Sequence, residues 1–120
     1  MRFDKYFNSL EFDSPDEPGS GEKMDLPFIN RLVSARILYG QKMEINSGFR
    51  TEKHNKRVGG KDNSAHLRGF AADIRINNST ERLLLIKALL DVGFTRIGVA
   101  NTFIHVDNDP FLPQNALWKY

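Results

Sequence analysis

Two of the three histidines in this chain lie close to aspartates, at spacings that suit a metal site or a catalytic site. His66 precedes Asp73 by seven residues, and His105 precedes Asp107 by two. Side chains alternate between the two faces of a strand, so a strand through this second pair places Phe103, His105 and Asp107 on one face. Burying imidazole and carboxylate groups is unfavourable unless they are paired or bind a ligand. These four polar residues are the first candidates for chemistry.

Two imidazoles and one carboxylate are enough to hold a catalytic zinc ion and to leave a fourth position for water. Water in that position becomes a source of hydroxide near neutral pH. The spacing alone leaves a second interpretation open, because a single histidine in a strand is more often a hydrogen-bonded core residue. The chain has no cysteine, which excludes a disulfide framework, a thiol nucleophile and any cysteine-ligated zinc, haem or iron–sulfur site.

The apolar spacing predicts the helices that would position these residues. A helix is expected from about Met24 to Gly40. Its buried side would be formed by Phe28, Ile29, Leu32, Val33 and Ile37. A second helix is expected from about Thr80 to Val92, because an Asn78-Asn-Ser-Thr cap is followed by Glu81 and the apolar run ends at Gly93.

Alternating apolar residues predict short strands. One is expected within 42–49 and a half-buried one over 70–76. Two more, over 94–99 and 102–107, would form a hairpin around Ala100-Asn101. The result is an α+β fold, a small antiparallel sheet with helices packed on it.

The remaining segments are predicted from their polarity and their turn residues. Residues 13–22 read as a surface loop, and residues 50–69 as a long functional loop with about one helical turn. The last thirteen residues are expected to wrap back over the sheet. Three aromatic residues are assigned first to the core: Phe49, Phe103 and Trp118.

Composition limits the class of protein. With 120 residues, 40% hydrophobic and 27% charged, the chain predicts one compact domain over residues 1–120. No stretch approaches the ~20 apolar residues of a membrane span, so we expect no membrane insertion. A net charge of +2 is too small to predict nucleic-acid binding. We also expect a monomer.

An ordered set of motifs resembles a known family. The set comprises Ser47-Gly-Phe-Arg50, Asn55, Val58-Gly-Gly60, Ser64-x-His66-x-x-Gly69-x-Ala-Ala-Asp73 and Phe103-Ile-His105-Val-Asp107. It is similar to the zinc D-Ala-D-Ala carboxypeptidases, peptidase family M15. The likeness runs from about residue 10 and extends to the short bacterial and phage branch that ends in Trp-x-Tyr, here Trp118-Lys-Tyr120.

The resemblance implies a hedgehog/D-Ala-D-Ala-peptidase fold and one zinc ion per chain, held by His66, Asp73 and His105. It also implies cleavage of a peptide bond in peptidoglycan stem peptides by zinc-activated water. The bond could be that of a D-Ala-D-Ala carboxypeptidase, a dipeptidase or an L-Ala-D-Glu endopeptidase.

The sequence departs from several branches of the family at the expected catalytic acid. Thr102 and Ala100 stand where those branches place an acid or a histidine, and neither can act as a base. Asp107 is therefore the candidate general base, a role that needs a raised pKa, which an apolar surrounding would supply. Its position ~6–7 Å along the strand from His105 predicts no direct contact with that ring. The competing role for Asp107 is to orient a ligand.

Arg50 and Ser64 are the candidate substrate-binding residues. In the family the residue matching Arg50 faces the substrate, and its planar guanidinium could hold a carboxylate or stabilise an oxyanion. Ser64 could contact the substrate or cap its own turn. His54 is expected to be an exposed loop residue rather than a fourth ligand, and Gly59-Gly60 to serve the backbone geometry.

Two functions follow. The first is a zinc peptidase of the bacterial cell wall. The second is a zinc-stabilised cell-wall or virion binding module with little or no turnover, which the missing upstream acid keeps open. The first residues lack an apolar core of signal-peptide length, so we expect synthesis in the cytoplasm without an export signal. Action on the wall would then suit a phage or prophage lysis protein or a virion component.

Overall fold

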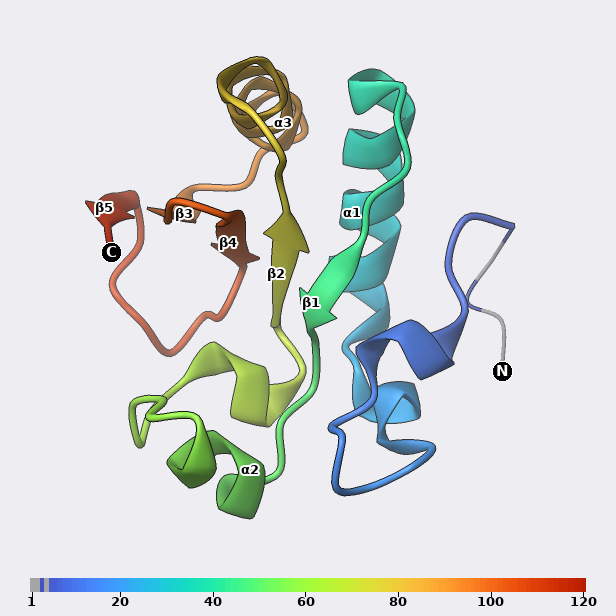
Figure 1. Ribbon diagram of the computed structural model, residues 1–120, viewed down its shortest axis with the longest axis vertical. Coiled ribbons are helices and arrows are strands. Elements are labelled where there is room, and N and C mark those ends of the chain that lie inside the picture. Colours follow the sequence, from blue (N-terminus) through green and yellow to red (C-terminus); the bar gives the residue numbers. More distant parts are fainter. Residues whose placement is uncertain (1–2, 4) are drawn as a thin grey trace.

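A five-stranded mixed sheet organises the chain (Figure 1). The computed structural model describes residue 3 and residues 5–120, so the start of the chain, where the sequence predicts no export signal, lies partly outside it. The strands are β1 (Ile45–Ser47), β2 (Ala71–Arg75), β3 (Arg96–Val99), β4 (Phe103–Asp107) and β5 (Ala116–Lys119), in the spatial order β1-β2-β4-β3-β5. The helices are α1 (Leu26–Tyr39), α2 (Glu52–Arg57) and α3 (Ser79–Asp91), with short 3-10 turns η1 (Ser9–Phe12), η2 (Ser20–Lys23) and η3 (Ala65–Arg68). The predicted α+β class is confirmed.

Capping residues define the ends of both long helices. The side chain of Asp25 accepts a hydrogen bond from the Phe28 amide to start α1, and Gly40 ends it with φ +72°. Asn78 caps α3 in the same way by accepting from the amide of Glu81. One detail differs from the prediction: Ile37, expected on the buried side of α1, is 57% exposed.

The two faces of the sheet have different roles. One face packs against α1 and α3, which also pack against each other, and forms the apolar core. Its strand residues are Ala72, Ile74, Ile97, Ile104 and Val106. Because strand side chains alternate, the residues between them point to the other face, and these include Asp73, His105 and Asp107. The core therefore fixes the face on which the polar residues meet.

The polar segment 50–69 is more ordered than its composition predicts. It holds two elements, α2 and η3, rather than one helical turn. Thr51 caps α2 and Ser64 caps η3, each accepting from a backbone amide. η2 likewise begins within residues 13–22, where Ser14 and Ser20 are buried. Short polar residues that cap turns order both segments.

The C-terminal segment is a strand rather than a wrap over the sheet. β5 pairs in parallel with β3, so the sheet is not wholly antiparallel as predicted. Phe49 packs against the core as expected, but Phe103 and Trp118 are half-buried on the opposite face. The alternation of Ala116 and Trp118 against Leu117 is too short to stand out as a strand beside two prolines. Within the described residues, every helix is too short or too polar to cross a membrane.

Candidate metal centre

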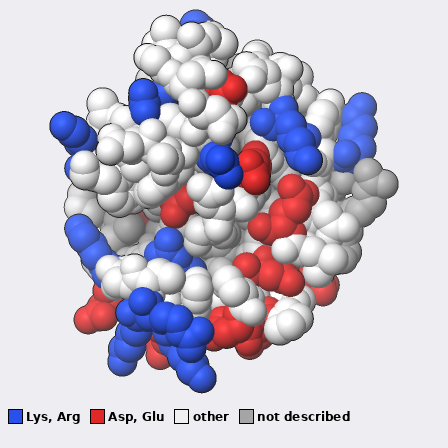
Figure 2. All heavy atoms as spheres, in the orientation of Figure 1, with Lys and Arg blue, Asp and Glu red and all other residues white. Residues whose placement is uncertain are grey.

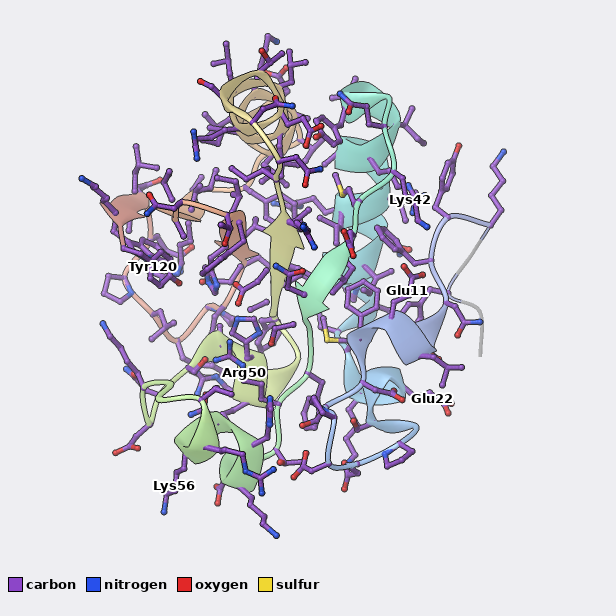
Figure 3. The ribbon with its side chains drawn as sticks, viewed as in Figure 1. Glu11, Glu22, Lys42, Arg50, Lys56 and Tyr120 are labelled. Carbon is purple, nitrogen blue, oxygen red and sulfur yellow. The ribbon has the colours of Figure 1, made fainter. Side chains whose placement is uncertain are left out.

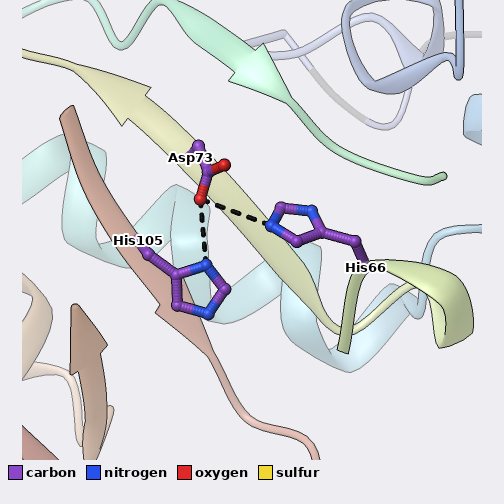
Figure 4. Close-up of side chains that lie close together, drawn as sticks. All are labelled: His66, Asp73 and His105. Carbon is purple, nitrogen blue, oxygen red and sulfur yellow. Dashed lines mark hydrogen bonds and ion pairs between the residues drawn. The ribbon is translucent and has the colours of Figure 1, made fainter. Parts of the chain in front are cut away.

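One row of residues crosses all five strands on the face opposite the core. Reading from β1, Ser47 pairs with Asp73, which pairs with His105, which pairs with Gly98, which pairs with Trp118. Antiparallel pairing brings Asp73 and His105 together although they lie far apart in sequence. η3, just before β2, brings His66 to the same place (Figure 4). The sheet register therefore assembles the three predicted ligands.

The three side chains form a tight, buried group. Oδ1 of Asp73 lies 2.9 Å from Nδ1 of His105 and 3.3 Å from Nε2 of His66. One donor atom from each residue lies within 4.8 Å of the other two. The three residues are 2–7% exposed. Such a set can converge on one ion without large movements.

The ring of His66 presents a free nitrogen to this group. Its Nδ1 is 2.7 Å from the carbonyl oxygen of Gly48, which can only accept, so Nδ1 carries the hydrogen. In the neutral ring Nε2 then holds a lone pair. This buried atom has no hydrogen-bond partner among the described residues, although it faces the carboxylate of Asp73. Two electron-rich atoms that face each other in this way fit a cation between them.

The ring of His105 is oriented in the same manner by a carboxylate. Its Nε2 is 2.7 Å from Oδ2 of Asp107, and a carboxylate only accepts, so Nε2 carries a hydrogen. Nδ1 is therefore the nitrogen that faces Asp73 and can hold a metal. Metal-binding histidines commonly donate their second ring hydrogen to a carbonyl or carboxylate in this way. The contacts with Gly48 and Asp107 leave one nitrogen of each ring facing Asp73, an arrangement that fits a bound metal ion.

Both carboxylate oxygens of Asp107 are hydrogen-bonded. The sequence predicted no contact with the His105 ring and a raised pKa, and both expectations are wrong: Oδ2 lies 2.7 Å from Nε2 of His105, and the pKa is lowered. The other oxygen of Asp107 accepts from Nε of Arg96 at 2.7 Å and from the backbone amide of Asp109. Although burial alone would raise its pKa, hydrogen bonds from His105 and the nearby charge of Arg96 lower it. These contacts fit a role in which Asp107 orients His105 better than they fit a role as general base.

The charges at the centre are coupled. Burial lowers the pKa of His66, against the opposing charge of Asp73. At His105 burial acts in the same direction, but hydrogen bonds with Asp107 and Asp73 prevail and raise its pKa. Both histidines in turn hold the pKa of Asp73 far below its usual range, despite its burial. Without a metal, the centre therefore favours a proton on His105.

Arg50 is part of the site rather than a solvated surface residue. Its side chain is 14% exposed. Nε donates to Ser47, Nη1 to the amide oxygen of Asn55, and Nη2 lies 3.3 Å from Oδ2 of Asp73. Gly60 permits this arrangement, because a Cβ there would overlap the amide oxygen of Asn55. The prediction that the two glycines serve backbone geometry is confirmed at Gly59, whose φ is +76°, whereas Gly60 makes room for a side chain.

The remaining candidates are placed differently. The hydroxyl of Ser64 accepts from the His66 amide at 3.3 Å, so it caps the turn that carries the ligand. His54 lies on α2 rather than in a loop, is only partly exposed and does not join the group of three. Sequence reasoning missed Arg96 and the carbonyl of Gly48. A charged residue inside the predicted strand 94–99 was the available signal for Arg96, whereas a backbone carbonyl leaves none.

Comparison with known proteins agrees with this geometry. A family model described as Peptidase M15 matches residues 14–107. The chain belongs to the Peptidase M15 family. The match includes Arg50 and all three members of the buried group, and ends before β5. No curated protein matches the chain. Membership of Peptidase M15 makes this a peptidase fold with a candidate metal centre at its sheet face.

Proposed function

We propose that the protein is a zinc-dependent peptidase that hydrolyses a peptide bond in the stem peptides of peptidoglycan. The observation that carries this proposal is the buried group of His66, Asp73 and His105, in which each imidazole is held through its outer nitrogen so that the other nitrogen faces the carboxylate. Two nitrogens and one carboxylate oxygen suit zinc and leave a position open. Zinc bound there would act as a Lewis acid and supply hydroxide from water near neutral pH.

In this proposal, the protein's own residues hold and orient the reactants. Gly48 and Asp107 fix the two rings through their outer nitrogens. Arg50 is pinned by Ser47 and Asn55 beside Asp73. Its planar charge is suited to a carboxylate of the substrate or to negative charge that develops on the scissile carbonyl. Ser64 supports the centre by capping η3, and its hydroxyl is the second candidate substrate contact.

Stem peptides are small, carry carboxylates and would meet positive charge near this centre. Lys53, Lys56, Arg57 and Lys61 are all exposed on and after α2, the segment that holds Asn55. Figure 2 shows Lys and Arg gathered over this part of the molecule. We propose that the protein acts on the cell wall as a monomer and that it serves a phage or prophage in lysis or in the virion. The bond cleaved would be that of a carboxypeptidase or of an endopeptidase.

A second candidate function is a metal-stabilised binding module of the cell wall or virion. It is favoured by one observation: Asp107, the candidate base, is fully engaged by His105 and Arg96. Digestion of purified muropeptides by zinc-loaded protein, followed by mass spectrometry, separates the two functions. A peptidase releases D-Ala or splits the stem at one bond, and the mass of the products identifies that bond. Intact muropeptides, with zinc bound to the protein, support the binding module.

A further inference from the structure

The C-terminal strand β5 places two aromatic side chains beside the metal centre. Trp118 pairs with Gly98, and Gly98 pairs with His105, so these three residues form one row. The rings of Trp118 and His105 lie 5.4 Å apart, and the ring of Tyr120 lies 5.2 Å from that of Phe103. Both residues of β5 therefore lie against the face that carries the ligands. Figure 3 shows Tyr120 at the C-terminal edge of this face.

Gly98 makes room for both rings. A Cβ at this position would lie 2.6 Å from Nε1 of Trp118 and 2.7 Å from Cε2 of Tyr120, closer than side chains can pack. The guanidinium of Arg96 covers the Trp118 ring at 5.0 Å, and the same group bonds Asp107. Trp118 is thus held between Arg96 and His105, and Tyr120 follows it in the strand.

The ring of Tyr120 lies beside Phe103 and Gly98 on the face that carries the ligands and remains open to solvent. The residue is 61% exposed, so its ring does not serve the core. Burial of part of the ring and the negative charge of Asp73 raise its pKa, while a hydrogen bond with Trp118 and the charge of Arg50 oppose the increase. A tyrosine with a raised pKa keeps its hydrogen at neutral pH, so it is a donor.

We propose that Tyr120 binds the substrate: its hydroxyl donates a hydrogen bond to an acceptor oxygen of the peptide that lies at the metal centre, and the platform of Gly98 and Trp118 holds it there. This inference rests on the proposed function. In this inference β5 forms one wall of the substrate site, and Arg50 lies on the opposite side. β5 lies outside the residues that the family model matches. A peptide between them would meet a neutral donor on one side and a cation on the other.

Tyr120→Phe tests the proposal because it removes only the hydroxyl. Tyr6→Phe is the matched control, since Tyr6 packs against Arg36 of α1 rather than on the metal face. For Tyr120→Phe we expect kcat/KM on muropeptides to fall about tenfold or more, the range of one hydrogen bond to a charged or developing-charge oxygen. Zinc content and the denaturation midpoint should stay at parental values. Tyr6→Phe should remain within about twofold of the parent.

Binding supplies a second measurement that does not need turnover. Trp118 is the only tryptophan in the chain, so its fluorescence reports directly on this wall. Titration of metal-free protein with a stem peptide should change the emission, and Tyr120→Phe should weaken the apparent affinity about fivefold or more.

The outcomes separate this inference from the proposed function. Equal kcat/KM and equal peptide affinity in Tyr120→Phe and the parent overturn the role of Tyr120 and leave the peptidase intact. A parent that binds the peptide but does not cleave it when loaded with zinc overturns the peptidase, and the affinity of the variant still decides the role of Tyr120. A parent that neither cleaves nor binds the peptide overturns both.

Discussion

At the scale of single residues, the centre depends on which atom of each ring is committed elsewhere. The carbonyl oxygen of Gly48 accepts a hydrogen bond from Nδ1 of His66, and the carboxylate of Asp107 accepts one from Nε2 of His105. Both remaining nitrogens face Asp73. The ligand set is therefore defined by the partners behind the ligands as much as by the ligands themselves.

Asp107→Asn separates the two roles of this residue. The amide keeps the shape but loses the charge that Arg96 and His105 share. If Asp107 orients His105, zinc affinity should fall about 10–100-fold and activity should return when zinc is in excess. A loss of about 10²–10⁴ in kcat that persists with zinc fully bound would instead identify Asp107 as the general base.

Arg50→Lys tests the planar cation. Three nitrogens of Arg50 contact Ser47, Asn55 and Asp73, and a lysine ammonium cannot reproduce that fork. We expect kcat/KM on cell-wall peptides to fall about 30–150-fold, with zinc content unchanged. A variant within about twofold of the parent would show that Arg50 does not act on the substrate.

At the scale of elements, the site is a product of sheet register. Ser47, Asp73, His105, Gly98 and Trp118 occupy one row because four strand pairings align there. A slip of one residue in β4 would send His105 into the apolar core and Ile104 to the metal face. The buried apolar residues that alternate with the ligands make such a slip unfavourable.

Gly98→Ala should disturb the end of this row. The added methyl group meets Trp118 and Tyr120, and crowding of this kind typically costs about 1–3 kcal/mol. We expect chemical denaturation to show this loss together with a shift in Trp118 emission as its ring moves. Leu117→Ala, at an exposed position of the same strand, should stay within about 0.5 kcal/mol of the parent. Unchanged emission in Gly98→Ala would contradict the packing described for β5.

The sequence was sufficient for elements with long periodic patterns and for residues with distinctive chemistry. The two long helices and the 94–107 hairpin follow from apolar spacing, caps and terminal glycines. β5 was missed because four residues after two prolines carry little period-two signal. The contact between Asp107 and His105 was missed because Cα spacing does not fix side-chain direction, and the engagement of Arg96 depends on the pairing of two strands.

At the scale of the whole molecule, folding brings the acceptor atoms of His66, Asp73 and His105 together, and a cation is needed to balance their negative charge. The raised pKa of His105 means that a proton supplies this balance in metal-free protein. A group whose folded pKa exceeds its unfolded value contributes stability that is complete below the unfolded value, about 6.5, and is lost as pH rises through the folded pKa. Asp73 stays ionised throughout. His66, whose pKa is lowered, is neutral in the folded protein but titrates near 6.5 when unfolded, so its effect on stability rises up to about that pH and is constant above it.

Metal-free protein should therefore become less stable as pH rises above about 7, and zinc should reverse the loss most strongly at the upper end. Thermal unfolding with a chelator and with excess zinc, at several pH values, measures this. His54→Ala, which removes a histidine outside the centre, should keep the same profile. A metal-free midpoint that is flat or rises over this range would contradict the charge balance described for the centre.

The metal centre is tested most directly by the zinc content of the purified protein, compared with that of three variants in which one histidine is replaced. We predict one zinc ion per chain in the parent and in His54→Ala, which leaves the buried group intact. We predict a large loss in His66→Ala and in His105→Ala, because each removes one of three ligands. Far-ultraviolet circular dichroism verifies that the variants remain folded. Full zinc occupancy in both ligand variants would contradict the assignment of the metal centre to His66, Asp73 and His105.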